Sequence, residues 1–257
     1  MNKNHLKLFL ISIYCLALVL FFAFPFSSFG QDARIVMVTE HWPPFRINDD
    51  SSPSGFRGID IEIMDSLSAK LGITIEIQRH PWARALELMR SGQADMITGI
   101  AYTPEREGFI HYIPKSYAAV QAVFYTQKGK GSTLRSYQDL YGPTVGYSLH
   151  SAYFQPFDGD TKIKKMGLSS ELQLLKMLAL ERLDVIIGTD PNVSYDIAQL
   201  GYRNTLEPTA YQPPDKTELF IALSRKSPAL ARAKEIEQAL LSLLDEGTID
   251  AILKKYR

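Results

Sequence analysis

An arginine at the end of residues 103–106 has the surroundings of an anion-binding group. Thr103 can cap the start of a helix with its hydroxyl, and Pro104 suits the first helical turn. Arg106 then lies one residue further inside, beside backbone N–H groups that have no helical partner. A guanidinium fork matches a carboxylate in bidentate geometry. The pattern predicts a carboxylate site, and the alternative is a surface arginine that pairs with Glu105 or Glu107.

Two acidic residues follow predicted strands and are expected at the edge of a sheet. Asp190 comes just after the apolar run 185–187, and Glu40 follows the run 34–39. Open α/β sheets place ligand-binding groups beyond the carboxyl ends of their strands, so both residues are candidates. Asp190 could also cap a helix that begins at Pro191, and the two roles are compatible. Glu40 could contact a ligand amine or form a structural pair, and the sequence favours neither.

The sequence does not support an enzyme site of the common kinds. Residues 146–150 read Gly-Tyr-Ser-Leu-His, but a nucleophile elbow needs a small residue where His150 stands. No histidine follows position 150, so the hydrolase order of serine, acid and histidine is not possible. The five histidines show no H-E-x-x-H spacing, and the single cysteine, Cys15, lies in an N-terminal apolar run. We therefore expect no catalytic residue, no metal and no cofactor.

The elements that must position these groups alternate between strand and helix. Short β-rich runs and amphipathic helical patterns follow one another, which is typical of βαβ units and predicts an α/β fold. Strands are predicted over 34–39, 73–78, 95–98, 117–127, 144–147, 162–165, 185–187 and 218–223. Helices are predicted over 58–71, 81–90, 171–182, 229–244 and 248–256, and one more begins near Ser151.

Two extended runs, near 122–126 and 218–223, bracket about 90 residues and predict two lobes. A chain that leaves one compact unit, builds a second and returns to the first would show this arrangement. We assign residues 31–123 and 219–257 to lobe 1 and residues 124–218 to lobe 2. Two α/β lobes joined by two strands leave a cleft between them, and small ligands bind in such clefts.

Residues 1–30 have the pattern of a secretory signal peptide. The start is basic, the run 8–26 is apolar, and Ser28 and Gly30 supply the small residues that a cleavage site needs. The alternative is an uncleaved anchor helix. Hydrophobic residues make up 46% of the chain and charged residues 22%, which argues against a disordered, collagen-like or multi-pass membrane protein. The net charge of zero argues against a nucleic-acid-binding surface.

Seven motifs stand in order along the rest of the chain. They are W-P-P-F at 42–45, G-I-D-I-E-I at 58–63, G-x-x-D-M at 92–96, T-P-E-R at 103–106, the strand 144–147 with the helix after it, L-D-V-I-I-G-T-D at 183–190 and D-E-G-T-I-D-A-I-L-K-K-Y at 245–256. Together they resemble the family 3 bacterial extracellular solute-binding proteins, the periplasmic receptors of polar amino acid uptake systems.

This resemblance implies a fold, a ligand class and a partner. The fold would be a two-lobed α/β periplasmic binding protein of type II, with two strand crossovers between the lobes. The protein would be a periplasmic monomer that captures a small polar amino acid or a related carboxylate. Its partner would be the permease of an ABC-type importer, and it would bind no nucleic acid.

The resemblance also implies roles for individual residues. Arg106 would hold the α-carboxylate of the ligand, and Asp190 would pair with its α-ammonium group. Trp42 and Trp82 would sandwich the ligand side chain, although partial burial at a lobe surface is the alternative. Ser151 stands where the family has a hydroxyl that donates to the carboxylate. Closure of the lobes would bring Arg106 and Asp190 onto opposite ends of one ligand.

Three positions depart from the family pattern and leave the identity of the ligand open. Ala101 replaces a Ser or Thr that contacts the α-ammonium group, and His150 replaces the usual Gly. Arg84 is an additional cation, which could meet a second carboxylate of the ligand or pair with Glu87 on the same helix face.

Two other functions fit the same resemblance. A free-standing sensor subunit that reports its ligand to a membrane kinase would use the same closing lobes. A dehydratase acting on cyclohexadienyl amino acid precursors would need Asp190 or Glu40 as a general acid with a raised pKa, and nothing in the sequence selects for one. Neighbouring permease and ATPase genes would favour uptake.

Overall fold

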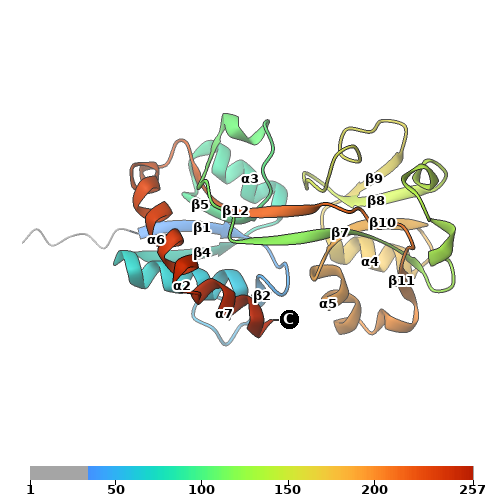
Figure 1. Cartoon of the computed structure of the whole chain (residues 1–257), viewed down its shortest axis with the longest axis horizontal. Coiled ribbons are helices and arrows are strands. Elements are labelled where there is room, and N and C mark those ends of the chain that lie inside the picture. The colour runs from blue at the N-terminus through green and yellow to red at the C-terminus, as the bar shows by residue number, and fades with distance from the viewer. Residues whose placement is uncertain (1–33, 257) are drawn as a thin grey trace, which may run out of the picture. The chain divides into compact units, whose positions relative to one another are not determined.

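The computed structural model describes residues 34–256, which form two α/β lobes (Figure 1). The predicted signal peptide, residues 1–30, lies outside the described residues. The strands of both lobes join in one 10-stranded sheet with the order β4-β1-β5-β12-β7-β10-β8-β9, to which β6 and β11 are added at the side. None of the helices within residues 34–256 combines the length and the apolar character needed to cross a membrane.

Lobe 1 is built on three parallel strands. Strand β1 (Arg34–Thr39) lies between β4 (Thr74–Arg79) and β5 (Met96–Ile100). Strand β12 (Lys216–Ser224) runs antiparallel to β5 and also pairs with β6 (Ile110–Tyr112). The carboxyl ends of β1 and β5 therefore meet at one edge of the sheet, where Glu40 and Ala101 follow them.

Helices cover both faces of this sheet (Figure 1). Alternate residues of β1 point to opposite faces, so Met37 belongs to one apolar core and Val38 to another. A short hairpin of two strands leads from β1 into the first helix. The hairpin consists of β2 (Ile47–Asn48) and β3 (Phe56–Arg57). The helices on the Met37 side are α2 (Ile59–Leu71), α6 (Ala233–Asp245) and α7 (Thr248–Lys255), and the helix on the Val38 side is α3 (Trp82–Ser91).

Lobe 2 repeats the plan with a smaller sheet. Strand β8 (Thr144–Ser148) lies parallel to both β9 (Lys164–Leu168) and β10 (Val185–Asp190). Strand β7 (Ala118–Gln127) runs antiparallel to β10 and also pairs with β11 (Leu206–Pro208). The carboxyl ends of β8 and β10 point toward the junction with lobe 1 (Figure 1).

Two strands cross between the lobes and pair with each other on the way. Residues 118–121 of β7 lie antiparallel to residues 216–219 of β12, and each strand continues into the sheet of both lobes. This is the two-lobed α/β architecture with two strand crossovers that we predicted. The exact lobe limits, at 123/124 and 218/219, stay a prediction.

Helices α4 (Glu171–Ala179) and α5 (Asn192–Gln199) pack against one face of the lobe 2 sheet. Helix α4 begins where we predicted, because the Ser170 side chain accepts a hydrogen bond from the Gln173 backbone N–H at 3.3 Å. It ends at Ala179 rather than at Arg182. Helix α5 lies where we considered a helix beginning at Pro191 as the alternative role of Asp190, and it supplies an acidic residue to the site described below.

Two predicted helix starts are wrong. No helix begins near Ser151, where residues 149–163 form turns and irregular backbone. Pro156 disfavours helix at the residue before it and has no backbone N–H, so the chain cannot continue as a helix there. The segment after Thr103 forms only a short 3₁₀ turn, Arg106–Gly108, in place of an α-helix.

Candidate ligand-binding site

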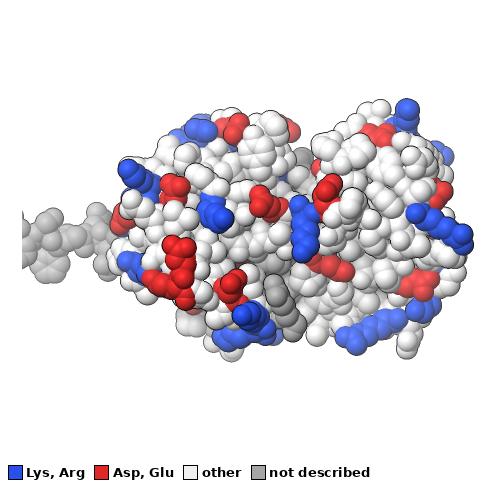
Figure 2. Space-filling view, viewed as in Figure 1, with Lys and Arg blue, Asp and Glu red and all other residues white. Residues whose placement is uncertain are grey.

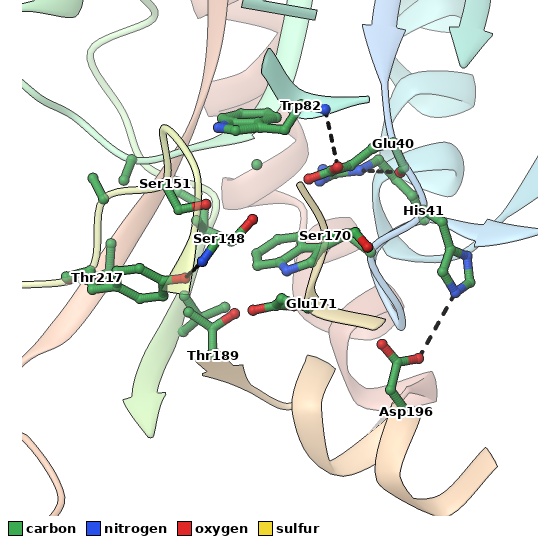
Figure 3. A pocket seen from close by; sticks show the side chains of 18 of the residues that line it. Glu40, His41, Trp82, Ser148, Ser151, Ser170, Glu171, Thr189, Asp196 and Thr217 are labelled. Carbon is green, nitrogen blue, oxygen red and sulfur yellow. Dashed lines mark hydrogen bonds and ion pairs between the residues drawn. The ribbon is translucent and has the colours of Figure 1, made fainter. Parts of the chain in front are cut away.

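A cavity of about 170 Å³ lies between the lobes and is lined by residues of both. The ends of β1 and β5 and the start of α3 line it from lobe 1, and the ends of β8 and β10 and the start of α4 line it from lobe 2. Figure 2 shows the groove between the lobes, with charged side chains of both signs along it. Figure 3 shows the cavity from close by. Its size suits a molecule of amino acid dimensions.

Arg106 is a buried cation whose side chain reaches across to lobe 2. Its Nη1 donates to the Ala101 backbone oxygen and its Nη2 to the His150 backbone oxygen, each at 2.7 Å. The residue is 7% exposed and lines the cavity. Burial lowers the pKa of Arg106 from its ordinary value, which reflects the loss of water around the guanidinium. Both bonds go to neutral carbonyls, so the positive charge remains available to an anion in the cavity.

The two tryptophans form walls of the cavity on the lobe 1 side. Trp82 is the first residue of α3, and its Nε1 donates to the His150 backbone oxygen at 3.2 Å. Trp42 is half-buried and stacks on Phe45 with 4.7 Å between the ring centroids. The two rings therefore reach the cavity from different segments, as the resemblance implied.

A buried ion pair that we did not predict packs against the Trp42 ring. The Arg46 guanidinium lies 4.9 Å from the Trp42 ring centroid and pairs with Asp60, and the two residues are 1% and 0% exposed. Asp60 also accepts hydrogen bonds from the hydroxyls of Tyr117, at 2.7 Å, and Thr98, at 2.8 Å. Arg46 directly follows W-P-P-F and Asp60 lies inside G-I-D-I-E-I, so both motifs carried a signal for this pair.

The structure does not place Asp190 among the residues that line the cavity. Asp190 Oδ1 accepts hydrogen bonds from Ser194, one from its backbone N–H at 3.1 Å and one from its hydroxyl. Asp190 thus caps the first turn of α5. Thr189, one residue earlier in β10, lines the cavity in its place. Successive strand residues point to opposite faces, so a count that is off by one residue selects the wrong side chain.

The acid that lobe 2 brings to this position is Glu171, the first residue of α4 (Figure 3). Its Oε2 is buried and has no hydrogen-bond partner among the described residues, and the same holds for Oγ1 of the neighbouring Thr189. Burial raises the pKa of Glu171 well above its ordinary value, and the charges of Asp196 and Glu40 raise it further. Sequence reasoning missed Glu171 because an acid in the first turn of a helix is common for helix-dipole reasons alone.

Glu40 and Asp196 complete the acidic lining from opposite lobes. Glu40 Oε2 accepts a hydrogen bond from the Trp82 backbone N–H at 3.2 Å, so Glu40 has a structural contact as well as a place in the cavity. Asp196 Oδ1 lies 3.9 Å from Nε2 of His41 across the lobe junction (Figure 3). Burial raises the pKa of both carboxyl groups to about 7.

The remaining predicted residues divide into one inside the cavity and one outside. Ser151 lines the cavity beside the end of β8. Arg84 is exposed on α3 and is not among the lining residues, while Glu87 pairs with Arg90 at 3.7 Å. Within residues 34–256, no three His, Cys, Asp or Glu side chains gather in a way that could hold a metal ion.

Two lobes joined by two strands around a small cavity define a ligand-binding protein of the two-lobed type. Residues 35–257 match the bacterial extracellular solute-binding proteins, family 3, and the chain belongs to this family. This identification confirms the resemblance and the fold inferred from the seven motifs.

Individual relatives lie at low sequence identity. The chain is 25% identical over 246 residues to the arginine-binding extracellular protein ArtP of Bacillus subtilis, covering 90% of this chain and 88% of that protein. It is 22% identical over 219 residues to the L-cystine-binding protein TcyJ of Escherichia coli, covering 84% and 79%. These relatives are binding proteins.

Solved structures share the fold. An ancestral arginine-binding protein bound to arginine has a TM-score of 0.75 at 21% identity, covering 87% of this chain and 98% of that one. A histidine kinase sensor domain similar to periplasmic binding proteins has a TM-score of 0.76 at 19% identity, covering 88% and 96%.

Proposed function

We propose that this protein captures a small polar amino acid, or a related carboxylate, in the periplasm and delivers it to the permease of an ABC-type importer. The observation that carries the proposal is Arg106, a buried guanidinium on a small cavity between two lobes, bonded only to carbonyls through its terminal nitrogens. Membership of the solute-binding family and the amino acids named for ArtP and TcyJ support the same ligand class.

Within this site, Arg106 receives the carboxylate of the ligand. Ser151, on the lobe 2 side of the cavity, adds a hydroxyl donor for the same group. Trp42 and Trp82 enclose the middle of the ligand with their rings. Arg84, which is exposed outside the cavity, takes no part in this proposal.

Glu171 takes the ligand ammonium in place of Asp190. Its carboxylate lines the cavity next to Thr189, and the buried Oε2 and Thr189 Oγ1 are two acceptors that an ammonium group can satisfy. Asp190 is instead occupied by Ser194 at the start of α5.

Closure of the lobes follows from contacts that join them around the cavity. The His150 oxygen of lobe 2 accepts from Arg106 and Trp82 of lobe 1, and Asn192 Nδ2 donates to the Pro43 oxygen at 3.0 Å. A ligand that touches both lobes favours this closed arrangement by its differential affinity for it, and the permease then recognises the closed form.

The wider assignment keeps the remaining sequence predictions as parts of the proposal. The protein is a monomer exported by residues 1–30, with lobes at 31–123 plus 219–257 and at 124–218, and it releases its ligand unchanged. The likeness to a histidine kinase sensor domain supports a ligand-sensing subunit as the second candidate. Permease and ATPase genes beside the gene for this chain separate uptake from sensing.

A thermal-shift screen of residues 31–257 against the common amino acids and dicarboxylates tests the proposal. A ligand at 100 times its Kd stabilises a protein by about 2.7 kcal/mol, which for a chain of this size is roughly 5–11 °C in Tm. A shift of this size with an amino acid or carboxylate, and recovery of the unchanged compound, supports capture. No shift with any of them refutes it, and consumption of the compound assigns an enzyme instead.

A further inference from the structure

The described lining of the cavity holds more acidic than basic side chains. Its acidic residues are Glu40, Glu171 and Asp196, and its arginines are Arg46 and Arg106. Arg46 is already paired with the buried Asp60, which leaves Arg106 as the one unpaired cation facing three carboxyl groups in the described lining. His41 also lines the cavity, but burial lowers its pKa, so it adds no charge at neutral pH.

These carboxylates are close enough to oppose one another's ionisation. The charges of Asp196 and Glu40 both act on Glu171. In a site shielded from water, like charges at short range cannot all be present unless positive charge lies among them. A zwitterion brings one positive group and one negative group, so it leaves the surplus of acid unchanged.

An independent observation shows that part of this lining is prepared for a hydrogen-bond donor. Thr189 is 7% exposed and lines the cavity, and its Oγ1 has no partner among the described residues. Buried polar atoms are hydrogen-bonded in almost every native structure. The partner of this hydroxyl and of the adjacent Glu171 Oε2 is therefore expected from the ligand, and an ammonium group supplies three donors.

Two of the three acids, Asp196 and Glu40, lie where the two lobes meet. Asp196 is 4% exposed, and its Oδ1 lies 3.9 Å from His41 Nε2 across the junction. His41 Nδ1 accepts the Asn48 backbone N–H at 3.2 Å, so in the neutral ring Nε2 carries the hydrogen. Glu40, from lobe 1, is held at Oε2 by a backbone N–H. The Trp82 N–H and the neutral His41 ring therefore lie against these two carboxyl groups without bringing a positive charge to them.

We infer that the cavity takes an amino acid with a positively charged side chain, and that Glu171 and Asp196 select it. This inference rests on the proposed function and specifies its ligand class. Arg106 holds the carboxylate, Glu171 with Thr189 holds the α-ammonium group, and Asp196 with Glu40 holds the side-chain cation at the junction of the lobes. Such a ligand brings two positive charges and one negative charge, which reduces the surplus of acid that a neutral amino acid would leave.

Matched pairs of ligands test the inference by isothermal titration calorimetry on residues 31–257. L-citrulline has the shape of L-arginine without its side-chain charge, and L-norleucine lacks the side-chain ammonium of L-lysine. We expect at least one cationic member to bind at least about 30-fold more tightly than its neutral partner, as for loss of one partner in a buried charge pair. Agmatine, which is arginine without the carboxylate, should also bind more weakly than arginine.

Three single substitutions locate the two cation subsites. Asp196→Asn should weaken the cationic ligand and leave the neutral partner nearly unchanged, so that the ratio of their affinities falls. Glu171→Gln should weaken both members of the pair to a similar degree, because both carry the α-ammonium group. Asp190→Asn is the control, since Asp190 lies outside the cavity and Asn also caps helices well. It should change neither affinity.

The outcomes separate this inference from the proposed function. If neutral or acidic amino acids bind as tightly as cationic ones, the inference is overturned and amino acid capture stands. If no amino acid binds but a dicarboxylate does, the inference is overturned and capture of a carboxylate stands. If neither class binds, both are refuted. If the Asp196→Asn variant keeps the wild-type ratio of cationic to neutral ligand affinity while its ligand-free Tm is unchanged, the subsite assigned to Asp196 is wrong.

Discussion

Nη2 of Arg106 in lobe 1 donates to the backbone oxygen of His150 in lobe 2 at 2.7 Å. The same oxygen accepts the indole N–H of Trp82 at 3.2 Å. His150 has φ of 64°, a left-handed conformation that is uncommon for residues other than Gly. One carbonyl thus joins the expected carboxylate-binding group and an aromatic wall to the opposite lobe, so ligand binding and lobe closure share the same residues.

Replacing Arg106 by Ala should abolish most ligand binding. We expect a loss of about 2–5 kcal/mol, typical for removing one partner of a buried charge pair. Titration calorimetry with the amino acid that gives the largest thermal shift measures this loss. Arg84→Ala is the matched control, because Arg84 is exposed on α3 outside the cavity. Equal affinities of the Arg106 and Arg84 variants would remove Arg106 from the site.

Replacing Trp82 by Phe should weaken binding while keeping most of the packing. The change removes the indole N–H that reaches His150 and reduces the ring area against the ligand. We expect a cost of about 1 kcal/mol, in the range of aromatic and cation–π contacts. The chain has two tryptophans, so the fluorescence change on ligand addition should shrink in this variant. An unaltered affinity together with an unaltered fluorescence response would place Trp82 outside the site.

Loss of the buried partner of Arg46 should destabilise lobe 1. Asp60→Asn leaves the Arg46 guanidinium without its carboxylate, which for a buried pair costs about 3–5 kcal/mol. Urea unfolding of the ligand-free protein measures the change. The control is Asp49→Asn, which disturbs a solvent-accessible pair with Arg57 at 3.7 Å and should cost far less. Similar losses in the free energy of unfolding for the two variants would show that the buried pair stabilises the fold no more than the solvent-accessible pair does.

The ligand-free protein should lose stability as the pH rises from about 4.5 to above 7. Burial raises the pKa of Glu40 and Asp196 to about 7, from 4.5 and 3.8. Over this window the folded protein retains protons that the unfolded chain releases, so the free energy of unfolding falls as the pH rises through it. The double substitution Glu40→Gln and Asp196→Asn removes this contribution.

Urea midpoints of the wild type and of that double variant, taken at pH 5 and pH 8, measure the effect. The variant should gain stability relative to the wild type between the two pH values. A constant difference would mean that neither carboxyl group titrates differently in the folded and unfolded states. Asp190→Asn serves again as a carboxylate control outside the cavity.

The strands and helices that position this site were predicted better than the acidic residues that line it. The period of the apolar residues located β1, α2, β10 and the crossing strands, because burial of one face governs each of them. Arg106, Trp42, Trp82, Ser151 and Glu40 were all predicted, and all line the cavity. Their functional roles stay proposals.

The prediction for Asp190 was wrong by one residue along β10. The run L-D-V-I-I-G-T-D ends on an acid, but the cavity face of β10 is occupied by Thr189, and the carboxylate comes from Glu171 on another element. Asp196 was not predicted, because we considered the helix after Pro191 only as something Asp190 could cap and assigned none of its residues to the site. Contacts between segments far apart in the sequence decide which acid reaches the cavity, and a single sequence does not carry that information.

A crystal structure of the protein with its best-binding amino acid tests the central claim most directly. We predict that the ligand lies in the cavity between the lobes, with its carboxylate within hydrogen-bond distance of the Arg106 guanidinium and its ammonium group against Glu171. A ligand bound elsewhere, or one whose carboxylate lies away from Arg106, would contradict this account.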